Sequence, residues 1–184
     1  MKQIKFYGRG GQGVVTASKI FVSAVIQEGK FAHAVPSFGQ ERKGAPVFAY
    51  ARLDEKPIDL RSFVYNPDGV IVFDLFIREL GIDISSGVKP ETVLVANTKM
   101  SPEETGLTSD FKKIGCIDAF AITEEILGKA PPNAAMLGAL CKTTEWVSLE
   151  SICNALREYL PGKRGELNAK AARCGFSRVQ IWKK

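Results

Sequence analysis

The residues most able to bind a ligand lie near the start of the 184-residue chain, where four glycines fall within six residues. They are Gly8, Gly10, Gly11 and Gly13, and Gln12 precedes the last of them. Without Cβ atoms, such a segment can turn tightly and let the backbone approach a bound group. The first amides and the dipole of the helix that follows favour an anion there. The segment therefore predicts a turn that can bind an anion such as a phosphate.

The spacing Gly-x-Gly-x-x-Gly in residues 8–13 also fits the dinucleotide-binding fingerprint, in the expected position between a strand and a helix. A nicotinamide site further requires an acidic residue about 20 residues later, at the end of the second strand, to bind the ribose hydroxyls. The nearest acid, Glu28, precedes the next predicted strand at 31–35. A nicotinamide-dependent dehydrogenase is therefore disfavoured. Another anionic ligand, a subunit interface, and a strand–helix connection that binds nothing remain open.

Clustered metal ligands and long apolar segments are both missing from the sequence. Cys116, Cys141, Cys153 and Cys174 are far apart and the single histidine is His33, whereas zinc and iron–sulfur sites need clustered ligands. We expect buried free thiols, no metal held by this chain alone, and a structural histidine in a strand or loop. No apolar run reaches about 18 residues and no signal peptide precedes the first strand, so we expect a cytoplasmic protein without membrane contact.

The positive charge is concentrated at the C-terminal end. The formal net charge is +5, and seven basic residues follow Pro161 against the single acid Glu166. Such a segment can attract an acidic partner or a phosphate, although a solvated helix face is the commoner explanation. Because no aromatic-rich nucleic-acid motif accompanies it, we expect no binding of nucleic acid.

Hydrophobic periodicity predicts a single α/β domain over residues 1–184. The alternation in 47–53 indicates a half-covered strand, typical of antiparallel or edge pairing. The predicted strands are 2–7, 31–35, 47–53, 69–74, 92–96 and 114–120. The predicted helices are 14–28, 76–80, 121–128, 133–142, 148–159 and 163–174. This alternation, with a helical C-terminal third, favours a three-layer α/β/α sandwich with a mixed, mainly parallel sheet.

Two motifs together resemble the gamma subunits of the 2-oxoacid:ferredoxin oxidoreductases, the group that includes pyruvate synthase and the 2-ketoisovalerate and 2-oxoglutarate enzymes. One is GRGGQGVVTAS at 8–18, and the other is PSFGQERKGAPVFAYARL at 36–53. The segments 133–140, 147–151 and 161–168 fit the same pattern, so the resemblance covers nearly the whole chain. A related alternative is the small subunit of indolepyruvate oxidoreductase. A free-standing nucleotide- or flavin-binding protein is the alternative of another class.

The resemblance implies one subunit of a larger enzyme. The complex oxidatively decarboxylates a 2-oxoacid with coenzyme A to give acyl-CoA, and passes two electrons through iron–sulfur clusters to ferredoxin. Thiamine diphosphate would lie between the alpha and beta subunits, and the clusters in the beta and delta subunits. The gamma subunit would hold no cofactor alone, complete the assembly with these partners, and contribute to the coenzyme A side of the site. We therefore expect the isolated chain to be inactive.

The same resemblance implies roles for individual residues. The residues expected to face the phosphates of coenzyme A are Gly8, Gly10, Gly11, Gln12, Gly13, Arg42 and Lys43. Arg42 would add a bidentate donor, and Lys43, where the family commonly has glycine, would add a point charge or face solvent. Alternatively the glycines only pack the helix on the sheet, and Arg42 pairs with Glu41 or with a partner carboxylate. The loop 36–46 and the strand 47–53 would form part of the contact surface with the partner subunits.

Overall fold

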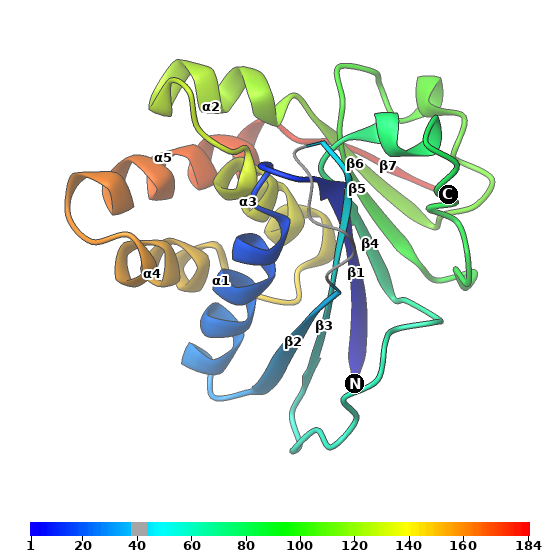
Figure 1. The fold of residues 1–184 in the computed structure, drawn as a ribbon, viewed down its shortest axis with the longest axis horizontal. Helices are drawn as coiled ribbons and strands as arrows, with labels where there is room; N and C mark the ends of the chain where they lie inside the picture. Colours follow the sequence, from blue (N-terminus) through cyan, green and yellow to red (C-terminus); the bar gives the residue numbers. More distant parts are fainter. Residues whose placement is uncertain (38–43) are drawn as a thin grey trace.

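A seven-stranded mixed β-sheet forms the centre of the protein, in a computed structural model that describes residues 1–37 and 44–184. Its strands are β1 (Lys2–Arg9), β2 (Phe31–Ser37), β3 (Pro46–Asp54), β4 (Gly69–Val72), β5 (Val93–Asn97), β6 (Lys113–Ile117) and β7 (Gln180–Lys183). The strand order is β2-β3-β1-β4-β5-β6-β7 (Figure 1). The strands β1, β4, β5 and β6 run parallel, whereas β2, β3 and β7 pair antiparallel with their neighbours. The predicted mixed sheet is confirmed.

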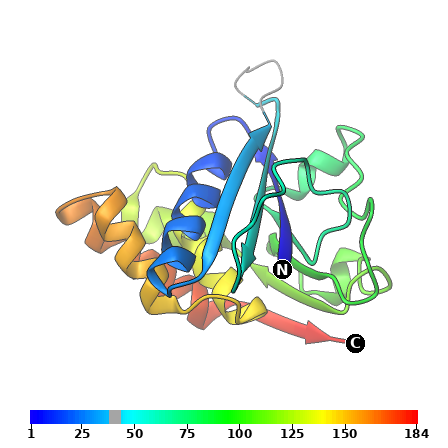
Figure 2. The ribbon, with the colours of Figure 1, turned by 90° about the horizontal axis from the view of Figure 1, so that it is seen from below.

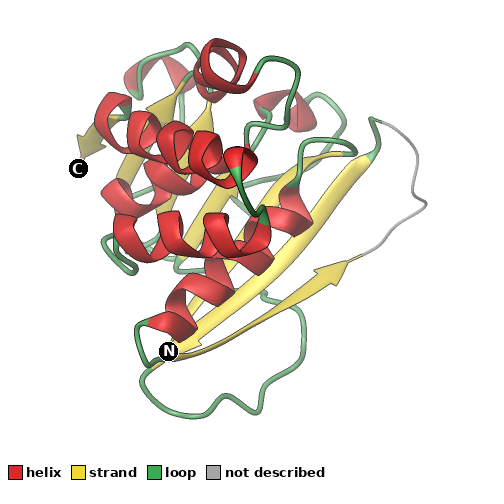
Figure 3. Cartoon of the chain, turned by 90° about the vertical axis from the view of Figure 1, so that its left-hand side faces the viewer, coloured by secondary structure: helices red, strands yellow, loops and turns green. Residues whose placement is uncertain are grey.

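The five α-helices of the described residues cover one face of the sheet (Figures 1 and 3). They are α1 (Val14–Gln27), α2 (Ala119–Leu127), α3 (Asn133–Thr144), α4 (Leu149–Tyr159) and α5 (Lys163–Arg178). The opposite face carries the 3-10 helices η1 (Leu75–Arg78) and η2 (Glu103–Thr105) and the loops around them (Figure 2). The α/β class is therefore confirmed, and the layer opposite the α-helices consists of loops and short 3-10 helices.

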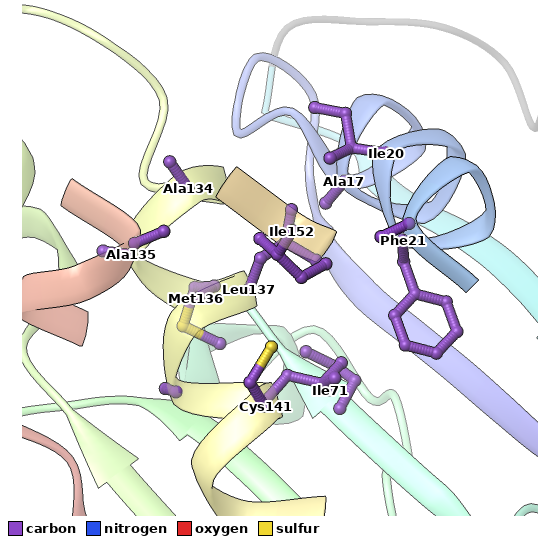
Figure 4. Close-up of a cluster of buried hydrophobic side chains, with 14 of the residues drawn as sticks. Ala17, Ile20, Phe21, Ile71, Ala134, Ala135, Met136, Leu137, Cys141 and Ile152 are labelled. Atoms are coloured by element: carbon purple, nitrogen blue, oxygen red, sulfur yellow. The ribbon is translucent and has the colours of Figure 1, made fainter. Parts of the chain in front are cut away.

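The larger apolar core lies between the sheet and the α-helices (Figure 4). Phe21 of α1, Ile71 of β4, Leu137 of α3 and Ile152 of α4 all pack in this core. Ten of the twelve residues of α3 are buried, because the sheet covers one side of this helix and α5 packs against another. The position of α3 is therefore fixed by contacts on several sides, which matters because its first residues lie beside the glycine-rich turn.

A smaller core fills the space between the sheet and the loops on its other face. Val70 and Val72 of β4 point into it, on the opposite side of the strand from Ile71, and they pack with Ile77 of η1 and with Phe111. Both faces of β4 are thus covered, which explains the continuous apolar run that predicted a central strand. The connection from β4 to η1 is anchored by this second core.

The boundary between β6 and α2 differs from the prediction. The predicted strand 114–120 is too long, since β6 ends at Ile117 and α2 begins at Ala119. Asp118 causes the change: its carboxylate accepts a hydrogen bond from the backbone N–H of Ala121 at 3.0 Å and caps the helix. The capping signal of an aspartate at this position therefore outweighs the apolar run that continues past it.

The strand β7 is missing from the sequence-based prediction. It pairs antiparallel with β6, so that Trp182 lies opposite Ile114 at the edge of the sheet. The helix α5 continues to Arg178, beyond the predicted end at 174, and β7 begins two residues later. With no glycine or proline between the helix and so short a strand, the sequence carries no turn signal for this change of structure.

The strand β3 lies inside the sheet, between β2 and β1, and its predicted antiparallel pairing is confirmed. The prediction of a half-covered strand is wrong at Arg52, which is only 2% exposed. Its guanidinium donates to Oε1 of Gln3 at 3.0 Å and to the carbonyl oxygen of Ser62 at 2.7 Å. The loop that contains Ser62 therefore covers the second face of β3, held there by a buried arginine.

Candidate functional site

The candidate site lies at the carboxyl ends of β1 and β4, two neighbouring parallel strands. From β1 the chain continues into α1 on the helix face, whereas from β4 it continues into η1 on the opposite face. Neighbouring parallel strands whose connections leave on opposite faces open a crevice between them, which is the usual ligand position in open α/β sheets. The glycine-rich turn after β1 therefore lies where the topology favours binding.

The glycines of this turn serve different purposes. A Cβ atom on Gly8 would lie 2.5 Å from Cγ2 of Val14, so this glycine lets α1 pack close to β1. Gly13 caps α1 with a φ of 74°, and a Cβ there would lie 2.9 Å from Nδ2 of Asn133 on α3. Gly11 has a φ of +94°, and no described atom lies within 4 Å of the place its Cβ would take. Packing therefore explains Gly8 and Gly13, whereas Gly11 offers an incoming group close access to the backbone.

Some backbone N–H groups of the turn are used internally and others are open. Gly10 donates to the carbonyl oxygen of Ala45 at 2.9 Å, and Gln12 donates to that of Arg9 at 3.1 Å. Within residues 1–37 and 44–184, no acceptor serves the amides of Gly11, Gly13, Val14, Val15 and Thr16. Unpaired donors at the start of a helix attract anions, and the first turn of α1 contains no acidic residue that would oppose this.

An open pocket adjoins the turn. It is lined by Gly11 and Gln12, by Phe120 at the start of α2, and by Lys129 and residues 130–132 in the connection between α2 and α3. Lys129 is exposed, and it forms no ion pair in the described part of the chain. The sequence analysis missed Phe120 and Lys129, because only the packing of α2 and α3 brings this connection beside the turn.

A hydrogen-bonded network joins the turn to the end of β4. Nε of Arg9 and Nε2 of Gln12 both donate to Oδ2 of Asp74 at 2.9 Å, and Nη2 of Arg9 donates to the same oxygen. Oε1 of Gln12 accepts from the backbone N–H of Arg9 at 2.7 Å. The guanidinium of Arg9 also lies over the ring of Phe76, 5.0 Å from its centroid. Both polar atoms of Gln12, a predicted ligand residue, are thus bonded within the chain.

Arg42 and Lys43 lie outside the described residues, so their contact with a ligand stays a prediction. The described end of the same loop does lie beside the turn. Ala45 accepts the hydrogen bond from Gly10, and Pro46 of β3 is the partner of Arg9 in the register of β1 and β3. The two segments that carry the family resemblance therefore meet in space at this end of the sheet.

The four thiols lie in packing positions. Cys116, Cys141 and Cys153 are buried, Cys174 is partly buried, and all four are free, as predicted. Burial raises the pKa of the Cys116 thiol to about 12, so this group stays protonated near neutral pH. Among the described residues, no group of three or more His, Cys, Asp and Glu side chains could hold a metal ion. The thiols present do not fit an iron–sulfur cluster, whose ligands must lie close together.

The C-terminal basic segment forms ion pairs with other helices. Arg173 of α5 pairs with Glu150 of α4, and Arg178 pairs with Glu125 of α2, each at 2.7 Å. These contacts favour the explanation of a solvated helix face for this part of the positive charge. No helix in the described ranges is long and apolar enough to cross a membrane.

The chain is similar from end to end to subunits of known oxidoreductases. Residues 3–178 match the family model for pyruvate ferredoxin/flavodoxin oxidoreductase. The common gamma subunit of the pyruvate/ketoisovalerate oxidoreductases of Pyrococcus abyssi is 44% identical over 99% of both chains. Pyruvate synthase subunit PorC of Methanothermobacter marburgensis is 42% identical over 98% of both. The crystal structure of pyruvate oxidoreductase subunit PORC of Thermotoga maritima matches with a TM-score of 0.83 at 30% identity, covering 99% of this chain and 98% of that chain. This chain belongs to the pyruvate ferredoxin/flavodoxin oxidoreductase family.

Proposed function

We propose that this chain is the gamma subunit of a multi-subunit 2-oxoacid:ferredoxin oxidoreductase. The observation that carries the proposal is the similarity to proteins named as gamma or PorC subunits, at 42% and 44% identity over nearly all of both chains. The reaction joins the acyl group of a 2-oxoacid to the thiol of coenzyme A, releases carbon dioxide, and transfers two electrons to ferredoxin. The names of these relatives favour pyruvate or ketoisovalerate over indolepyruvate as the substrate.

In this proposal the oxidation takes place on the alpha, beta and delta subunits, which would hold the thiamine diphosphate and the iron–sulfur clusters. Among the described residues, the candidate site offers hydrogen-bond donors and the ammonium group of Lys129, and the carboxylate of Asp74, which contacts the turn, is already paired with Arg9. Such a site can bind and orient an anionic substrate. The chain would therefore complete the assembly and bind coenzyme A.

The glycine-rich turn would bind coenzyme A through its phosphates. The unpaired amides of Gly11 and Gly13 lie at the positive end of the α1 dipole, where a phosphate can accept several hydrogen bonds. Lys129 adds an ammonium group from the same pocket. The pantetheine arm would then extend toward the partner subunits, because its thiol must reach the acyl group that they hold.

Steady-state kinetics of the assembled enzyme test this site. We expect Lys129→Gln to raise the KM for coenzyme A about fivefold, which corresponds to about 1 kcal/mol, and to leave kcat and the KM for pyruvate unchanged. The matched control is Lys99→Gln, which removes an exposed ammonium group just after β5 that does not line the pocket. An unchanged KM for coenzyme A in Lys129→Gln, or an equal rise in both variants, would remove Lys129 from the site.

A further inference from the structure

We propose that Asp74 is a positioning residue, whose carboxylate holds the glycine-rich turn in the conformation that accepts an anion. Asp74 follows β4, the strand next to β1, and belongs to neither the predicted ligand residues nor the pocket. The effect on coenzyme A rests on the proposed function, whereas the contacts between Asp74 and the turn do not. Asp74 is thus assigned to the geometry of the site and not to contact with the ligand.

Three N–H donors converge on a single oxygen of this side chain. Oδ2 of Asp74 accepts from Nε and Nη2 of Arg9 and from Nε2 of Gln12. Its Oδ1 accepts from the backbone N–H of Phe76 at 3.0 Å, which fixes the orientation of the carboxylate on η1. The side chain of Asp74 is only 14% exposed, and charge-assisted hydrogen bonds shielded from water are strong. Asp74, which follows β4, therefore holds both Arg9 at the end of β1 and Gln12 in the turn.

The two residues held by Asp74 lie on either side of Gly10 and Gly11. Gln12 also accepts from the backbone N–H of Arg9, so the ends of this short segment are bonded to each other as well as to Asp74. Glycines have the largest conformational freedom of any residue. Without the anchor, the segment would sample more conformations, and a ligand would have to order it on binding, at a cost in affinity.

The same contacts neutralise the charge of Arg9 beside the turn. Asp74 pairs with Arg9, whose guanidinium also lies over the ring of Phe76. Because this pair has no net charge, the described groups that can attract an anion are the open amides, the positive end of the α1 dipole and Lys129. A carboxylate can therefore lie near an anion site without opposing it.

Asp74→Asn in the assembled enzyme tests the positioning role. Asparagine keeps the size of the side chain and an oxygen for the N–H of Phe76, but it loses the charge that holds Arg9. We expect the KM for coenzyme A to rise about tenfold, with kcat and the KM for pyruvate within twofold of the unmodified enzyme. We also expect faster hydrogen exchange of the peptide 8–16 in the enzyme without coenzyme A.

The matched control is Asp118→Asn. Asp118 also caps a helix after a parallel strand, but its carboxylate contacts α2 and Lys99 and not the turn. We expect this variant to change neither the KM for coenzyme A nor the exchange of 8–16. Adding Gln12→Ala to Asp74→Asn should raise the KM by less than the product of the two single effects, because both changes break one network.

The outcomes separate this inference from the proposed function. An unchanged KM for coenzyme A together with unchanged hydrogen exchange of 8–16 in Asp74→Asn would overturn the positioning role. An equal rise in the KM for coenzyme A and the KM for pyruvate would overturn it too, as would the same changes in Asp118→Asn. Protection of 8–16 by coenzyme A in the unmodified enzyme tests the proposed site alone. If that protection is absent, the proposed site fails, and the exchange rates of the two variants still decide whether Asp74 holds the turn.

Discussion

In the glycine-rich turn, residue type alone predicts the turn but not the role of each glycine. The four glycines at positions 8, 10, 11 and 13 predict a tight turn before a helix, and this turn is present. Which of these glycines is closely packed and which is accessible depends on Val14 and on Asn133, and Asn133 is more than a hundred residues away in the sequence. The sequence therefore predicts the turn, but it does not distinguish the glycines that pack from the glycine that is accessible.

Alanine substitutions distinguish these two kinds of glycine. In Gly8→Ala the new Cβ would lie 2.5 Å from Cγ2 of Val14, so β1 and α1 must separate and we expect a loss of about 2–3 kcal/mol in the free energy of unfolding. In Gly11→Ala only the positive φ is unfavourable, and we expect a loss of about 1 kcal/mol. Urea denaturation of both variants measures the difference, and equal losses would contradict this division.

His33 lies in β2, in agreement with the predicted structural role, and its charge state should make stability depend on pH. Its Nε2 is buried without a partner among the described residues, and burial together with Arg52 and Arg61 lowers its pKa. The unfolded chain, with an imidazole pKa of about 6.5, therefore binds a proton more readily than the native state does. As the pH falls below about 6.5, the free energy of unfolding must decrease until the native imidazole is also protonated.

The variant His33→Gln isolates this contribution. Between pH 7 and about pH 5.5, we expect the unmodified protein to lose more stability than the variant, because only it carries the titrating imidazole. Denaturant titrations at the two pH values measure the two slopes. Identical slopes in both proteins would show that His33 titrates alike in the native and unfolded states.

At the scale of elements, local signals predicted structure where they were strong. Ser148 caps α4 as expected, since its Oγ accepts from the backbone N–H of Ser151 at 3.1 Å. The edge strand β7 carries no such signal, and its existence depends on pairing with β6. Elements that are specified by caps and periodicity could thus be predicted, whereas an element specified by a distant partner could not.

The contact between α3 and α5 depends on two glycines that the periodicity does not single out. A Cβ on Gly138 would lie 1.8 Å from the carbonyl oxygen of Ala172, and one on Gly175 would lie 2.1 Å from that of Ala135. We expect Gly138→Ala to force the helices apart and to cost about 3 kcal/mol of stability, measured by thermal or urea denaturation. Ser177→Ala, at an exposed position of α5, is the control. A near-neutral Gly138→Ala would contradict this account of the packing.

At the scale of the whole molecule, the strand order creates the candidate site. β1 lies between the antiparallel β3 and the parallel β4, and the connections of β1 and β4 leave on opposite faces. The alternation of strands and helices predicted the α/β class, but it does not specify which strands become neighbours. The contact between Asp74 and the turn follows from that order, and the packing of α2 and α3 brings Lys129 beside the turn, so the sequence predicts only one side of the site.

The proposed role as a gamma subunit also makes a prediction for the whole molecule: if the chain only binds coenzyme A, it should catalyse nothing alone. The most direct measurement is affinity purification of the tagged chain from its native cell without oxygen, followed by an assay of dye reduction. We predict that the alpha, beta and delta subunits co-purify with the chain in a fixed ratio. The eluate should reduce dye only when coenzyme A and pyruvate, or a related 2-oxoacid, are both present. The separated chain should be inactive. Recovery of a lone chain from cells whose lysate retains this activity would contradict the assignment.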